Sequence, residues 1–108
     1  MAAKKKAIMP SGVDDNGLAW QDEDISGTTY RFREVTVQES DDAYDASLNE
    51  DKTFNQRLNQ RLLLASSIVS PKVAVDDISK WGIRKLIAML DAYDRINALP
   101  AADIEGNA

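Results

Sequence analysis

Apolar residues recur with helical spacing in the middle of the chain. Over residues 52–70, one apolar position follows another at steps of three or four, which places these side chains on a single face of an α-helix. The members of this stripe are Phe54, Leu58, Leu62, Ala65 and Val69. The spacing predicts a helix over 52–70 that ends before Pro71, with the stripe as its core face.

Three further apolar residues of this predicted helix, Leu63, Leu64 and Ile68, fall outside the stripe. On a wheel that turns about 100° per residue, Leu64 and Ile68 lie well to the side of it and Leu63 lies on the opposite side. These side chains either fill the middle of a three-helix core or form a patch that meets a partner or a second copy. The sequence does not decide between these two interpretations.

A second amphipathic region follows the extended segment 71–75. Asp76 or Asp77 supplies an N-terminal cap, and apolar residues from Ile78 to Leu99 give a broad apolar face. Gly82 interrupts this region. Because glycine inside a helix costs about 1 kcal/mol relative to alanine, we expect a bend there, or a junction between a short helix and a longer one.

The clearest strand covers residues 28–37, where β-branched and aromatic side chains dominate and Tyr30 and Phe32 alternate with arginines. One strand is not stable alone, so this one pairs with residues 18–20 in a hairpin or with another chain. The second option would make the strand edge near Tyr30 and Phe32 an assembly surface.

The remaining segments are acidic or short. Ser40 and the carboxylates after it predict a short helix over 41–48. The fold class expected is mainly α: an all-α type of small helical domain with three to four helices, a short N-terminal β-hairpin or strand, and flexible termini. The domain boundaries expected are a flexible arm over 1–27 with one short strand, a single helical domain over 28–100, and a flexible tail over 101–108.

The amino-acid composition excludes several classes of function. The 108 residues include no Cys and no His, which excludes Ser/His/Asp triads, Cys nucleophiles and Cys/His metal sites. We therefore expect no enzyme, no cofactor and no metal. The net charge of −5 argues against a nucleic-acid partner, and no apolar run has the 18 to 20 residues that span a bilayer.

The order of these elements resembles a known family. Residues 30–35 read YRFREV, residues 62–71 read LLLASSIVSP, and residues 75–81 read VDDISKW before a terminal amphipathic helix. A leucine-rich helix that stops at Ser-Pro before an acidic and apolar cap resembles the small tail assembly chaperones of long-tailed bacteriophages. The resemblance covers about residues 28–100 and leaves residues 1–27 outside.

The resemblance implies a helical adaptor that binds and solubilises the phage tape-measure protein and helps to recruit tail-tube subunits. It implies work in the host cytoplasm, self-association, and departure before the virion is finished. The residues that we expect to contact partners are the off-stripe set and the strand aromatics: Leu63, Leu64, Ile68, Tyr30 and Phe32.

Two other classes are alternatives. A small structural virion protein, such as a head-tail joining subunit, would also be oligomeric and non-enzymatic. A nucleic-acid-binding regulator would use basic side chains of the helices, although the acidic balance of the chain argues against it. Those basic side chains are Arg57, Arg61, Arg84 and Lys85.

Overall fold

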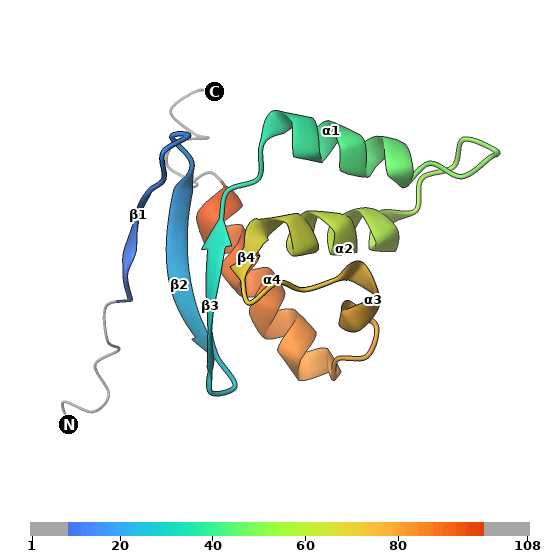
Figure 1. Ribbon diagram of the computed structural model, residues 1–108. Helices are drawn as coiled ribbons and strands as arrows, with labels where there is room; N and C mark the ends of the chain where they lie inside the picture. The colour runs from blue at the N-terminus through green and yellow to red at the C-terminus, as the bar shows by residue number, and fades with distance from the viewer. Residues whose placement is uncertain (1–8, 99–108) are drawn as a thin grey trace, which may run out of the picture.

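The computed structural model of the chain describes residues 9–98. Their elements, in chain order, are β1 (Ser11–Val13), β2 (Ala19–Ile25), β3 (Thr28–Arg33), α1 (Val37–Ala46), α2 (Gln56–Ser67), β4 (Ile68–Ser70), α3 (Val75–Ile78) and α4 (Ile83–Asn97). The strands form one antiparallel sheet in the order β1-β2-β3-β4. In Figure 1, α4 crosses one face of this sheet, and α1, α2 and α3 extend from its β4 side.

The expectation of a mainly α, all-α domain is wrong, because the sheet makes this an α/β fold. Three strands, β1, β2 and β4, were not foreseen at their observed extent. β2 carries three consecutive acidic residues and therefore lacks the apolar alternation of a typical strand. β4 comes from the end of the predicted helix 52–70, where α2 stops at Ser67 and the chain turns extended.

Two of the three acidic residues of β2, Asp22 and Glu23, have a basic partner, and the third, Asp24, is exposed. The expected strand 28–37 exists as β3, and it pairs with β2 through a two-residue turn at Ser26 and Gly27, both with positive φ. Across this hairpin Arg31 donates to Asp22 at 2.7 Å. The guanidinium of Arg31 also lies 3.7 Å from the ring centroid of Trp20, on the sheet face opposite to α4.

The N-terminal arm expected over residues 1–27 is replaced, for its described part, by β1 and β2. Gly12 of β1 faces Trp20 of β2, where a Cβ would come within 3.2 Å of the indole ring. The turn between the two strands closes on the Asp14 carboxylate, which accepts from two backbone N–H groups. The first eight residues and the tail expected over 101–108 lie outside the described residues.

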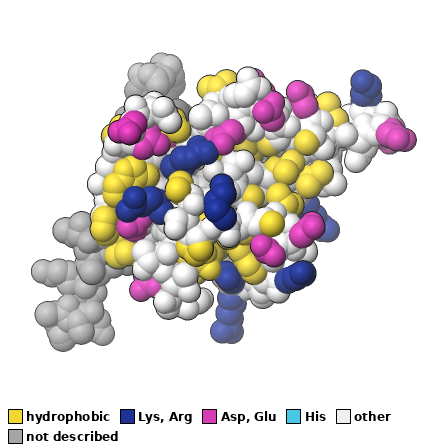
Figure 2. Space-filling model, viewed as in Figure 1, with side chains coloured by type: hydrophobic (Ala, Val, Ile, Leu, Met, Phe, Trp, Pro, Cys, Tyr) yellow, Lys and Arg dark blue, Asp and Glu magenta, His cyan; other side chains and the backbone are white. Residues whose placement is uncertain are grey.

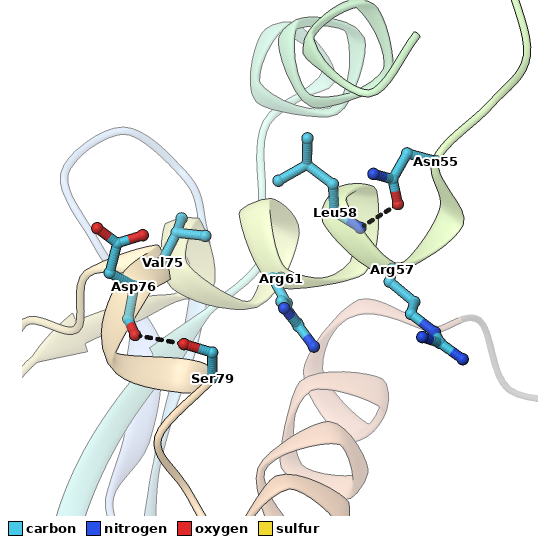
Figure 3. Close-up of a pocket in the computed structure, with 7 residues that line it drawn as sticks. All are labelled: Asn55, Arg57, Leu58, Arg61, Val75, Asp76 and Ser79. Carbon is cyan, nitrogen blue, oxygen red and sulfur yellow. Dashed lines mark hydrogen bonds between the residues drawn. The ribbon is translucent and has the colours of Figure 1, made fainter. Parts of the chain in front are cut away.

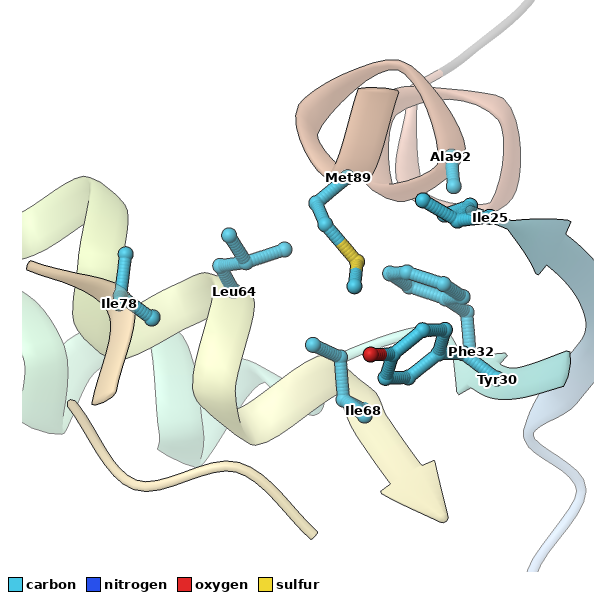
Figure 4. Close-up of a cluster of buried hydrophobic side chains, with 8 residues drawn as sticks. All are labelled: Ile25, Tyr30, Phe32, Leu64, Ile68, Ile78, Met89 and Ala92. Carbon is cyan, nitrogen blue, oxygen red and sulfur yellow. The ribbon is translucent and has the colours of Figure 1, made fainter. Parts of the chain in front are cut away.

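The core lies between the sheet and the helices (Figure 4). Met89 of α4 points at Phe32 of β3, and both side chains are fully buried. Leu64 and Ile68 close this core from the α2 side, also with no exposed surface. The complete cluster is Ile25, Tyr30, Phe32, Leu64, Ile68, Ile78, Met89 and Ala92.

The helix ends follow local chemistry. α1 begins at Val37 rather than at residue 41, because Thr36 and Glu39 form a reciprocal capping box. The junction expected at Gly82 is confirmed, since α3 ends at Ile78 and Gly82 is the N-cap of α4. Among the described residues, no helix has the length and apolar character needed to cross a membrane.

Candidate functional site

Most of the apolar stripe of α2 lies outside the buried core. Leu58, Leu62 and Ala65 are half-buried, and Val69, which continues the line into β4, is 38% exposed. The expectation that this stripe is the core face is therefore wrong except at Ala65, which packs against the core cluster. The sheet and α4 instead pack against the neighbouring face of α2, which presents Leu64 and, at its C-terminal end, Ile68. We call Leu58, Leu62, Ala65 and Val69 the α2 stripe.

Four of the five side chains expected to contact partners are buried. Tyr30, Phe32, Leu64 and Ile68 belong to the buried core, so none of them presents a side chain to a partner in this state. Leu63 is half-buried and lines a hollow between α2 and α4. Of the two interpretations left open by the sequence, core filling holds for Leu64 and Ile68.

A shallow hollow lies where α1 meets α2, along one side of the α2 stripe. Leu62 and Ser66 form its floor from α2, and Ala43 and Ala46 line it from α1. Two carboxylates of α1, those of Glu39 and Asp42, stand at the same hollow. An apolar floor beside acidic side chains is thus shared by these two helices.

A second hollow lies between α2 and α3 (Figure 3). Leu58 and Val75 point to one side of the α2 ribbon in this view, whereas Arg57 and Arg61 point to the other. Asp76 of α3 lines the hollow next to Val75, and its carboxylate lies on the same side as Leu58. Both arginines nevertheless line the same hollow as Leu58 and Asp76, so this side of the α2 stripe has cations as well as a carboxylate.

Figure 2 shows how apolar and acidic side chains are distributed on this surface. Hydrophobic side chains gather over α2, and acidic side chains border them both on α1 and on α3. The apolar contributors that line the two hollows are Leu58 and Leu62 of α2, Ala43 and Ala46 of α1 and Val75 of α3. The α2 stripe is thus an apolar band with two carboxylates of α1 on one side and a mixture of two arginines and Asp76 on the other.

The carboxylates beside the α2 stripe differ in whether an ion pair already neutralises them. Glu39 accepts two hydrogen bonds from Arg33, and this pairing lowers the pKa of Glu39 to about 2. Asp42 accepts only from the neutral amide of Gln38, at 2.8 Å. Within residues 9–98, the ion pairs join Arg31 to Asp22, Arg33 to Glu39 and Arg95 to Glu23. Asp42 and Asp76 therefore take part in none of the ion pairs of the described residues, although Arg57 and Arg61 line the same hollow as Asp76.

Other apolar side chains reach the surface elsewhere. Ile83 and Ile87, one turn apart on α4, are 68% and 54% exposed. Tyr44 and Phe54 stack with their ring centroids 5.1 Å apart, where the loop after α1 enters α2. Ile83 and Ile87 provide a second exposed aliphatic pair on a different helix, which serves below as a control surface.

Among residues 9–98, no three metal-ligating side chains gather in one place, and the chain contains no Cys or His for nucleophilic work. No family model, curated protein or solved structure matches the chain. The α2 stripe was visible in the sequence as a periodic pattern, but nothing in that pattern distinguished a core face from a binding face.

Proposed function

We propose that this chain is a non-enzymatic tail assembly chaperone of a long-tailed bacteriophage. In this role it binds and solubilises the tape-measure protein and helps to recruit tail-tube subunits. It works in the host cytoplasm and leaves before the virion is complete. The proposal joins the sequence resemblance over residues 28–100 to one structural observation.

That observation is the half-exposed α2 stripe. Aliphatic side chains aligned along one helix and left partly in water gain free energy when another apolar surface covers them. The charged side chains on both sides of the stripe, which include Asp42 of α1 and Asp76 of α3, favour the solubility of the free protein. Both properties suit a carrier for an aggregation-prone client.

The test is co-expression with the tape-measure protein encoded by the same virus. We expect the wild-type chain to raise the soluble fraction of the client and to co-purify with it. Leu58→Ser with Leu62→Ser should abolish both effects, because the apolar anchors of the surface are removed. Ile83→Ser with Ile87→Ser removes two exposed aliphatic side chains from α4 and should preserve both effects.

Three outcomes contradict the proposal. The first is a client that stays insoluble with the wild-type chain. The second is that the α4 variant fails to solubilise the client whereas the α2 variant still does so, which would place the binding surface on α4. The third is recovery of the chain in purified virions at stoichiometric amounts, which would identify a structural subunit such as a head-tail joining protein.

A further inference from the structure

We infer that the outer edge of β1 pairs with β1 of a second copy of this chain, in an antiparallel two-fold contact that joins two sheets into one. The inference goes beyond the proposed function, because it concerns a different surface from the α2 stripe. It follows from the free backbone groups of the edge, from the position of Pro10 in the ladder and from the charges at the two ends of the strand.

β1 is an edge strand, and no described element covers its outer side. It is the first strand in the order β1-β2-β3-β4, and all three of its residues are exposed. In Figure 1, β1 lies along the open side of the sheet, whereas α1, α2 and α3 extend from the β4 side. Such an edge presents unpaired N–H and C=O groups to another strand.

The register of the hairpin shows which backbone groups reach the open edge. The Pro10 carbonyl accepts from the Asp22 N–H at 2.9 Å, so the bonds to β2 are made at Pro10 and, two residues further on, at Gly12. Alternate residues of an antiparallel strand direct their backbone groups to opposite sides. The N–H and C=O groups of Ser11 and Val13 therefore point away from β2, into the open edge.

Pro10 leaves this edge intact. Proline has no N–H, so inside a sheet it interrupts the ladder on the side where that donor is required. At Pro10 this side is the inner one, because its backbone groups face Asp22 of β2. Both outward donors, those of Ser11 and Val13, are present, and the Val13 side chain next to them is 67% exposed. The open edge can therefore form a regular ladder with a second strand.

The charges at the two ends of the segment select the antiparallel direction and the second copy. Residues 4–6 are lysines, and Asp14 and Asp15 follow β1. Asp15 is exposed, and neither aspartate belongs to an ion pair of the described residues. About a two-fold axis at Pro10, Lys5 and Asp15 are equally distant in sequence, so each copy brings its lysines to the aspartates of the other. A parallel pair would instead bring like charges together.

The dimer leaves the α2 stripe accessible. α2 extends from the β4 side of the sheet, whereas the contact uses the β1 edge (Figure 1). Two copies joined in this way present two α2 stripes to one long client, and the second contact then becomes intramolecular. This consequence depends on the proposed function, but the dimer itself does not.

Sedimentation velocity of the full-length protein tests the contact. We expect a shift from monomer to dimer between about 10 μM and about 500 μM, because so short a strand pair buries less area than a standard interface. Val13→Pro removes an outward N–H and places a ring on the open edge, so it should weaken dimerisation by about tenfold or more. Val13→Ser keeps the N–H and should stay within about threefold of the wild type.

Charge reversal tests the direction of the strands. Lys5→Asp and Asp15→Lys should each weaken the dimer by about fivefold, because two symmetric attractions become repulsions. The two substitutions in one chain should restore the wild-type affinity, since the opposite charges then meet again. Asp24→Lys makes the same change in net charge as Asp15→Lys, at an exposed position beyond the residues of β2 that pair with β1. It should leave dimerisation unchanged.

The inference is overturned if the chain stays monomeric at every concentration, or if Val13→Pro leaves the dimer intact. Equal losses in Val13→Pro and Val13→Ser would assign the contact to side chains, and assemblies that grow beyond the dimer would exclude a closed two-fold pair. If circular dichroism shows that Val13→Pro is unfolded, the charge series decides, and a double variant that restores nothing contradicts the antiparallel pair. A monomeric chain that still solubilises the tape-measure protein would overturn the dimer and leave the proposed function in place.

Discussion

Leu62 and Leu64 lie two residues apart on α2 and face opposite environments. Leu64 has no exposed surface and packs in the core with Phe32 and Met89, whereas Leu62 lines the shallow hollow beside α1. The difference follows from the helical period, which separates positions two residues apart by about 200°. Two leucines of identical chemistry therefore lie in the core and at a surface hollow respectively.

Truncating these two leucines should have unequal effects on stability. Leu64→Ala leaves a cavity at the centre of the core and should lower the free energy of unfolding by about 2 to 5 kcal/mol. Leu62→Ala removes a side chain that is already partly in water and should cost about 1 kcal/mol or less. Urea denaturation followed by circular dichroism measures both. Equal losses would mean that Leu62 also belongs to the core.

Stability should fall in acid partly through Glu39. Its pKa is held at about 2 by the hydrogen-bonded Arg33, below the usual 4.5, so the folded state binds its proton later than the unfolded chain does. The stabilisation is present above about pH 5 and is lost as the pH falls from there towards 2. Urea midpoints between pH 7 and pH 3 measure the decline.

Glu39→Gln is the matched variant for that titration. Glutamine still fills the capping-box position by accepting from the Thr36 N–H, but it carries no charge for Arg33. The variant should be less stable than the wild type at pH 7, and the difference should shrink as the pH approaches 2. A constant difference across this range would show that the ion pair with Arg33 contributes nothing.

Asn97 joins the end of α4 to the segment after β3 and to α2. Its Oδ1 accepts from the Val35 N–H at 2.7 Å, and its Nδ2 lies 3.4 Å from Oγ of the buried Ser67. Asn97→Ala leaves the Val35 N–H without this acceptor and should cost about 1 to 3 kcal/mol. Gln60→Ala, at an exposed position of α2, should change stability by about 0.5 kcal/mol or less. Thermal melts of both variants check the contrast.

The sequence predicted the elements better than it predicted their packing. The strand at Tyr30 and Phe32, the helix around Leu62 and the junction at Gly82 all follow from local residue preferences. β2 did not, because its strand character depends on partners remote in sequence: Glu23 accepts from Arg95 of α4, 72 residues away. A single-sequence pattern contains no information about such a pair.

The face of α2 that enters the core was also beyond the sequence. The α2 stripe has more regularly spaced apolar residues than the face that is buried, where Leu64 is followed by Ser67. Ser67 is fully buried because its hydroxyl donates to the Arg33 carbonyl at 2.6 Å, a contact across 34 residues. Periodicity alone ranks a serine as an outward position, so the predicted and observed faces were exchanged.

The most direct test of the α2 stripe as the binding surface is thiol labelling, since the chain has no cysteine of its own. Three single variants suffice: Leu62→Cys on the stripe, Leu64→Cys in the core and Ile87→Cys on α4. In the free protein, a thiol reagent should modify the Leu62 and Ile87 variants readily and the Leu64 variant far more slowly.

Bound tape-measure protein should then slow modification of the Leu62→Cys variant by about tenfold or more and leave that of Ile87→Cys unchanged, because only the stripe is covered. The account is contradicted if the thiol of Leu62→Cys is modified as slowly as that of Leu64→Cys in the free protein. It is also contradicted if bound tape-measure protein slows modification of Ile87→Cys and leaves that of Leu62→Cys unchanged.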